Sequence, residues 1–239
     1  MLKAMRQLLL RTACAVGVLS SCAAWGQIPP SPSELARYQG LHAAASTGDM
    51  AQIQKLIAAR SDLNVRDGYG RTPLHVATFA KQAGAIRALV QAGAAINLLE
   101  NDRYDAVTIA AVADDEETLR ALLALGASAK QITSRYDGTA LIAAAHLGHE
   151  GVVRQLIAAG APLDHVNNLH WTAVIEAIVL GNGGARHLAT LKALVDAGAN
   201  LQLTDRQGFT PLQLARQRGF TAMVNMLLAA GARSESRGS

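Results

Sequence analysis

The chain has 239 residues, of which 50% are hydrophobic and only 4% aromatic. This length allows one or two domains, and an apolar content rich in alanine favours closely packed helices around a thin core. The formal charge of +4 includes Lys3, Arg6 and Arg11, so a chain that starts at Gln27 would carry about +1 (4 minus 3). This balance gives no electrostatic reason to expect a nucleic-acid partner.

The first 26 residues have the layout of a secretory signal peptide. A basic start is followed by an apolar stretch from Thr12 to Ala24 and by small residues up to Gly26. This stretch is too short for a membrane span and lacks the flanks of one. We therefore predict a signal peptide at 1–26 and an exported, periplasmic protein that begins at Gln27.

A second interpretation of the same segment involves Cys22. The run Leu19-Ser20-Ser21-Cys22 resembles a bacterial lipobox, in which the cysteine is lipidated and becomes the mature N-terminus. The protein would then be anchored to the outer membrane through Cys22, and both alternatives stay open. The one other cysteine, Cys14, lies within the signal, so the mature domain must be stable without a disulfide.

We predict that residues 27–35 form a linker and the start of an N-terminal cap helix. Ser31 is a suitable N-cap residue, Pro32 suits the first helical turn, and Glu34 completes a capping box. We expect one helix to continue from there to about Ala45. Arg60 stands where later units have glycine, which predicts a strained or differently closed helix end.

Two markers then recur in phase along the chain. A Gly-Ala pair recurs at intervals of 33, 34, 38 and 33 residues, and in four of five units its glycine lies 19 residues after the third position of a Thr-Pro-Leu-His-like marker. A period in this range predicts a solenoid of stacked units. The predicted units are 36–66, 67–99, 100–133, 134–166, 167–204 and 205–233, and residues 234–239 are a polar tail expected to be disordered.

Residues 67–99 represent one unit. A glycine-containing turn precedes Thr72, a good N-cap, and a short helix follows. A second helix buries one face and ends at Gly93, where a left-handed backbone suits glycine. Equivalent N-caps are Asp105, Thr139, Thr172 and Thr210, and second helices are predicted to begin with capping boxes at Asp49 to Gln52 and Asp114 to Glu117.

The segment from Asp67 to Asn97 carries D-x-x-G-x-T-P-L-H-x-A followed by a Leu-Val and Gly-Ala pattern, and it resembles the ankyrin repeat. Similar units cover residues 36–233. The resemblance implies an all-α solenoid of helix-turn-helix units linked by β-hairpin-like loops. It also implies that His75 bonds the capping threonine and backbone, and that the protein is not an enzyme.

Catalytic and metal-binding motifs are not found in the sequence. His146 and His149 have no third ligand at a suitable spacing, so we predict no metal and no cofactor. The glycine-rich segment Gly181–Gly184 is not preceded by a strand, as a phosphate loop would be. We interpret it as part of a five-residue insertion that lengthens the fifth unit.

Ankyrin-like proteins generally bind other proteins, and the resemblance implies contacts just before the capping residue and seven or eight residues after it. On the hairpin tips these positions are Tyr69, Arg71, Tyr104, Arg135, Tyr136, Trp171, Arg206 and Phe209. On the first helices they are Phe79, Val112, His146, Leu147, Val179, Leu180, Gln217 and Arg218.

Six of the nine aromatic residues fall on these positions, and aromatic and arginine residues are enriched at binding hot spots. We therefore predict a monomer that binds another protein, of unknown identity, through a concave groove. One alternative is that the aromatic residues only pack between neighbouring hairpins. Two other functional alternatives are a lipid-anchored structural protein of the envelope and a secreted effector that binds a host protein.

Overall fold

The computed structural model describes residues 27–233. The signal peptide, Cys22 and the tail at 234–239 lie outside the described residues. Within them the chain forms helices and loops without a named strand, and a single isolated bridge joins Thr133 and Gly138. The helices are α1 (Pro32–Leu35), α2 (Gly40–Thr47), α3 (Met50–Ala58), α4 (Pro73–Phe79), α5 (Ala83–Gln91), α6 (Ala106–Val112), α7 (Glu116–Ala124), α8 (Ala140–Leu147), α9 (Glu150–Ala158), α10 (Ala173–Val179), α11 (Ala185–Asp196), α12 (Pro211–Gln217) and α13 (Thr221–Ala229).

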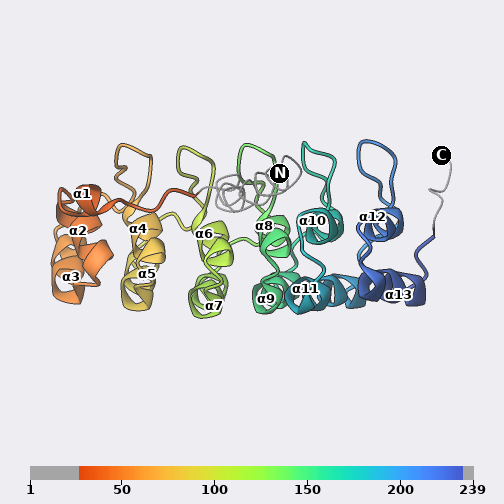
Figure 1. The fold of residues 1–239 in the computed structure, drawn as a ribbon. Helices are drawn as coiled ribbons and strands as arrows, with labels where there is room; N and C mark the ends of the chain where they lie inside the picture. The colour runs from red at the N-terminus through yellow and green to blue at the C-terminus, as the bar shows by residue number, and fades with distance from the viewer. Residues whose placement is uncertain (1–26, 234–239) are drawn as a thin grey trace, which may run out of the picture.

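The helices are stacked in two rows, as Figure 1 shows. The row from α2 through α4, α6, α8 and α10 to α12 is called the inner row here, and the row from α3 to α13 the outer row. Each inner helix contacts its own outer helix and the next inner helix, so the apolar core runs the whole length of the stack. The all-helical solenoid predicted from the repeats is confirmed.

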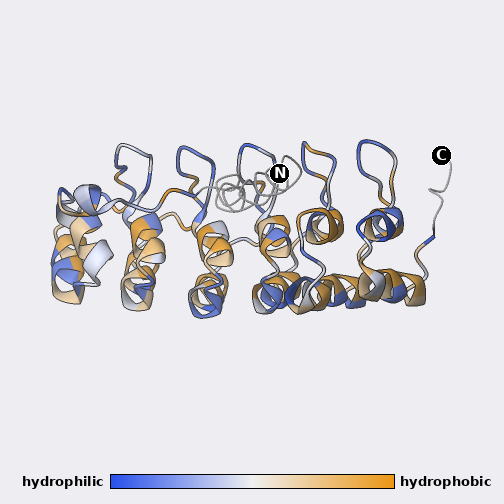
Figure 2. Ribbon diagram, in the orientation of Figure 1, coloured by the Kyte–Doolittle hydropathy of each residue, from blue (hydrophilic) through white to orange (hydrophobic). Residues whose placement is uncertain are grey.

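The loops that join successive helix pairs all project from the same side of the stack. They are largely hydrophilic, whereas apolar residues concentrate in the helices (Figure 2). Each pair of short helices therefore buries its apolar face only against its neighbours, which is the usual source of stability in repeat proteins.

The predicted N-caps of the inner helices are confirmed. Asp105, for example, accepts a hydrogen bond from the backbone N–H of Thr108 (2.8 Å). At α4 the backbone N–H of Thr72 donates to Nδ1 of His75 (3.1 Å), so Nε2 of His75 donates to the carbonyl of Leu98 in its own unit and to that of Tyr104 in the next unit. Burial lowers the pKa of His75 to about 4, and this neutral side chain ties two units together.

Two predictions about helix starts are wrong. The N-cap of α7 is Asp115, whose carboxylate accepts from the N–H of Thr118 (3.1 Å), while Asp114 has a left-handed backbone (φ 53°) and lies outside the helix. The N-terminal cap is two helices, because the extended backbone of Gln39 (φ −133°, ψ 167°) separates α1 from α2. The expected strain after α3 is present, since Arg60 adopts φ 54°.

Candidate functional site

An apolar strip lies along the C-terminal ends of the inner helices. Phe79, Val112 and Val179 occupy equivalent positions near the ends of α4, α6 and α10, and each is half-buried. Leu147 is also half-buried, and Leu180 is 42% exposed. In the last unit the equivalent residues are Gln217 and Arg218, both exposed, so the strip is apolar over four units and becomes polar at its C-terminal end.

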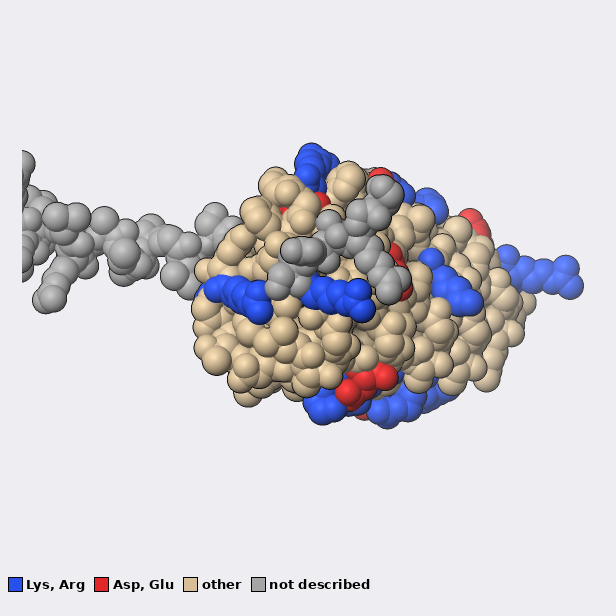
Figure 3. Space-filling view, turned by 90° about the vertical axis from the view of Figure 1, so that its right-hand side faces the viewer, with Lys and Arg blue, Asp and Glu red and all other residues tan. Residues whose placement is uncertain are grey.

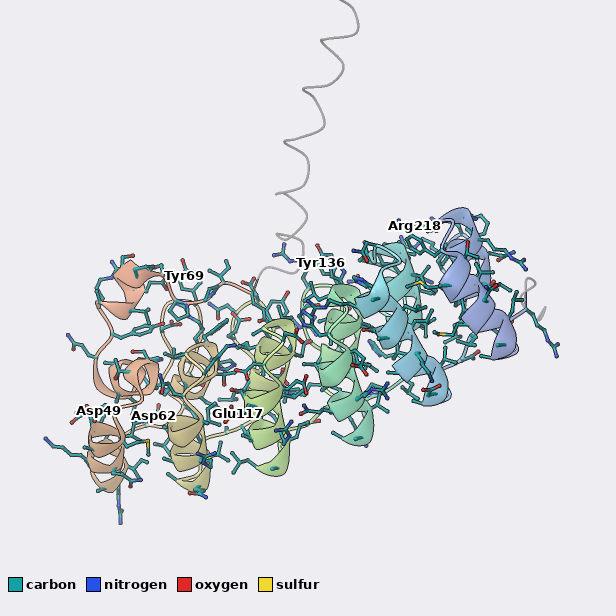
Figure 4. All side chains as sticks on the ribbon, turned by 60° about the horizontal axis from the view of Figure 1, so that its bottom comes forward. Asp49, Asp62, Tyr69, Glu117, Tyr136 and Arg218 are labelled. Carbon is teal, nitrogen blue, oxygen red and sulfur yellow. The ribbon has the colours of Figure 1, made fainter. Side chains whose placement is uncertain are left out.

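The hairpin tips provide a second set of exposed residues. Tyr69 is 43% exposed and Phe209 is 37% exposed, and Arg135 and Arg206 also face solvent. Figure 4 shows Tyr69 and Tyr136 along the upper edge of the molecule, where Arg218 is also labelled, whereas Asp49, Asp62 and Glu117 lie below this edge.

The C-terminal end of the stack is positively charged. Residues 205–233 contain four arginines, and their one acid, Asp205, is 8% exposed and accepts the backbone N–H groups of Gln207 and Phe209. Figure 3 looks onto this end and shows Lys and Arg side chains spread over it. The four side chains are Arg206, Arg216, Arg218 and Arg233.

Arg71 was predicted as an exposed contact residue, and this prediction is wrong, because its side chain is only 1% exposed. Its guanidinium donates from Nε to Asp67 (2.7 Å), from Nη2 to Glu34 and from Nη1 to the carbonyl of Ile28 (3.1 Å). The guanidinium also lies 4.5 Å from the ring centre of Tyr69. Arg71 thus fastens the segment before α1 to the first hairpin.

Tyr104 was also predicted to be exposed and is buried, with 5% exposure. Its backbone N–H donates to the carboxylate of Glu100 (2.9 Å), and its backbone carbonyl accepts from His75 (3.2 Å). The residue therefore lies where two units meet. Tyr136 and Trp171 are half-buried and pack against the core. These three side chains are therefore less accessible than Tyr69 and Phe209.

A buried polar cluster lies beneath the strip, and it was missed from the sequence. Glu176 on α10 is fully buried, its Oε1 accepts from Nδ2 of Asn167 (3.0 Å), and its Oε2 lies 3.2 Å from Nδ1 of His146. Burial raises the pKa of Glu176, although these two partners oppose the shift. The signal in the sequence was one acid in the otherwise apolar helix Ala173–Val179.

The equivalent positions in the other inner helices from α4 onward show how unusual this acid is. They hold Val76, Ile109, Ala143 and Leu214, all of which are buried. The imidazole of His146 borders the strip and contacts the carboxylate of Glu176, which occupies a position that is apolar in these other helices. Because the side chain of His146 is 15% exposed, this cluster adds a polar point to the strip in the fourth unit.

A metal centre or membrane span is not found among residues 27–233. His149 bonds the carbonyl of Ala111 through Nδ1 (2.9 Å). A hollow of about 400 Å³ lies where α7, α9 and α11 begin, and its lining includes Asp114, Glu116 and Arg186. Arg186 already pairs with Asp114 (2.8 Å).

The repeated helix pairs and capped hairpins match models of a known repeat family. A family model for ankyrin repeats (3 copies) matches residues 41–135 and 125–205, and a model for ankyrin repeats (many copies) matches residues 184–228. The chain belongs to the ankyrin-repeat family. Ankyrin repeats are generally protein–protein interaction modules, and the family is typically non-catalytic.

Similar ankyrin-repeat proteins include bacterial ones. The ankyrin repeat protein YahD of Escherichia coli (strain K12) is 35% identical over 190 residues, which are 79% of this chain and 94% of YahD. A solved ankyrin repeat domain from Acinetobacter baumannii AYE is 44% identical with a TM-score of 0.77, and the match covers 81% of this chain and 98% of that domain. The ankyrin repeat domain of Bcl-3, a member of the IκB protein family, is 28% identical with a TM-score of 0.73 and coverages of 83% and 88%.

Proposed function

We propose that this ankyrin-repeat protein is a non-enzymatic binding protein of the periplasm or cell envelope, with the apolar strip as its main contact surface. Leu180 is the observation that carries the proposal. A leucine side chain that is 42% exposed continues a row of half-buried apolar residues, and an apolar row left open to solvent is typical of a partner surface. The rigid stack would present this row to the partner with little conformational change.

The hairpin tips would supply the rest of the interface. Tyr69, Phe209, Arg135 and Arg206 remain accessible for contact, and large aromatic and arginine side chains are frequent hot spots. Arg71 and Tyr104 are not part of this interface, because their side chains are enclosed within the fold. The export of the chain rests on the predicted signal peptide.

Leu180→Asp is expected to abolish capture of the partner, because a charge would enter an interface that excludes water. The measurement is in-cell crosslinking and mass spectrometry with the tagged full-length protein, and we expect recovery of the partner to fall by about tenfold or more. Leu228→Asp is the matched control, since Leu228 is 46% exposed but lies on α13, away from the strip. Equal capture by both variants, or no specific capture by the wild-type protein, would contradict the proposal.

A lipid-anchored form of the same protein is the second candidate, and the Leu19-Ser20-Ser21-Cys22 run favours it. Dual acylation holds a protein stably on a membrane, whereas cleavage of the signal peptide after Gly26 would leave no lipid on the protein. Cys22→Ser should move the protein from the membrane fraction to the soluble periplasmic fraction if Cys22 is lipidated. An unchanged soluble distribution of wild type and variant, with Gln27 as the first residue, would exclude the anchor.

A further inference from the structure

The insertion in the fifth unit contains the one Asn-Gly pair of the chain, Asn182-Gly183. These residues lie in the loop between α10 and α11, and Asn182 is exposed. Neither the helix stack nor the apolar strip requires an asparagine at this position. The side chain of Asn182 is nevertheless held in a defined geometry, and that geometry bears on its reactivity.

We propose that Asn182 is a site of spontaneous covalent modification, in which the asparagine is converted to aspartate or isoaspartate through a cyclic imide. The backbone nitrogen of Gly183 would lose its proton and attack Cγ of Asn182, and the side-chain amide would leave as ammonia. Water then opens the five-membered imide at either carbonyl. The net reaction consumes one water and releases one ammonia, with no oxidation or reduction.

The side-chain carbonyl of Asn182 accepts a hydrogen bond from the backbone and lies beside a histidine ring. The backbone N–H of Gly184 donates to Oδ1 (2.9 Å), which identifies this atom as the oxygen of the amide. Nδ1 of His187 lies 3.2 Å from the same oxygen. Attack on Cγ places negative charge on Oδ1, and donors fixed around a developing oxyanion lower the barrier to such a reaction.

His187 is also bonded to the preceding unit. Nε2 lies 2.9 Å from the carbonyl of His146, which can only accept, so Nε2 must carry a hydrogen. This bond holds the ring so that Nδ1 faces Oδ1 of Asn182 (3.2 Å), which keeps the side-chain amide in one position.

Gly183 leaves the attacking nitrogen unshielded, because it has no side chain. A Cβ at this position would lie 2.5 Å from Cδ1 of Phe220, and the backbone is left-handed (φ 70°), so the site requires glycine. Other asparagines lack this combination. Asn97 and Asn200 each precede a leucine, whose branched side chain hinders attack by its own nitrogen.

The product is compatible with the fold. A carboxylate at residue 182 lies three residues before Ala185, the first residue of α11, where negative charge interacts favourably with the helix dipole. Arg218 is bonded to the carbonyl of Gly181 (2.9 Å), so the new charge would also appear beside the cationic end of the stack. The modification would therefore change surface charge without unfolding the protein.

The test is peptide mapping by mass spectrometry of the purified protein during storage at neutral pH. We expect Asn182 to gain the mass of an amide-to-acid conversion, in both aspartyl and isoaspartyl forms, while Asn97 and Asn200 serve as internal controls. The same protein kept in urea reports the reactivity of the sequence alone. Because the hydrogen bond from Gly184 and the contact with His187 form only in the folded state, we expect the folded protein to react about tenfold faster than the denatured one.

Two variants separate the parts of the proposal. Asn182→Gln should stop the reaction, because the longer side chain does not form the five-membered imide, and it leaves the loop otherwise intact. His187→Ala, shown to be folded by its thermal melt, should slow conversion at Asn182 without affecting the control asparagines. Conversion that is slower in the folded state than in urea, or that is unchanged by His187→Ala, would overturn the proposed role of the fold.

Discussion

Arg71→Ala is expected to lower the free energy of unfolding by about 3–5 kcal/mol, the usual loss when one partner of a buried ion pair is removed. The substitution leaves the carboxylates of Asp67 and Glu34 without their shared cation and the carbonyl of Ile28 without its donor. These bonds offset the desolvation of the Arg71 guanidinium and raise its pKa. The pKa of Asp67 is lowered although burial acts to raise it, because Tyr38 and Arg71 donate hydrogen bonds to its carboxylate. Urea denaturation of the wild-type protein and the variant measures the change.

The matched control is Arg87→Ala, which removes an exposed arginine from α5 and should change stability by less than about 0.5 kcal/mol. A second readout locates the effect. Because Arg71 holds the segment before α1, amide hydrogen exchange in residues 27–38 should increase more than exchange in α8 or α10. A loss in the variant below about 1 kcal/mol would mean that the network is not a net stabilising feature.

The repeat architecture could be predicted from the sequence because it depends on local and periodic features. N-caps, left-handed glycines and the i, i+3, i+4 pattern of apolar residues are each encoded within one unit, and recurrence removes the ambiguity of any single match. The cap of α7 was misassigned by one residue because Asp114 and Asp115 are adjacent acids, and only backbone geometry distinguishes them.

The candidate site could be predicted only in part, because exposure depends on contacts between distant residues. Arg71 and Tyr69 are two residues apart in one hairpin, yet one is buried and the other exposed, and Arg71 is the one bonded to Ile28 and Glu34. Glu176 could not be assigned to a partner, because His146 and Asn167 reach it from other elements. Repeat position alone identifies which residues can face the groove, and neighbouring segments decide which of them do.

Glu176→Gln is expected to stabilise the protein at neutral pH by about 1–2 kcal/mol, as neutral replacements of buried ionic groups often do. Glutamine keeps the shape of the side chain, can accept from Asn167 and can donate to Nδ1 of a neutral His146. In the wild-type protein burial raises the pKa of Glu176 above its value in the unfolded chain. The stability gained on protonation is therefore complete below the unfolded pKa of about 4.3 and is lost as the pH rises through the folded pKa.

The measurement is the difference in unfolding free energy between wild type and Glu176→Gln as a function of pH. We expect this difference to be largest at neutral pH and to vanish below about pH 4, where the wild-type carboxyl is protonated in both states. The contribution of His75, whose pKa burial lowers to about 4, decreases the stability of both proteins in acid and cancels in the comparison. Glu117→Gln, at an exposed position on α7, should show little difference at any pH. If Glu176→Gln is instead less stable than wild type at neutral pH, the bonds from His146 and Asn167 outweigh the cost of burying the charge, and the cluster stabilises the strip as an ion pair.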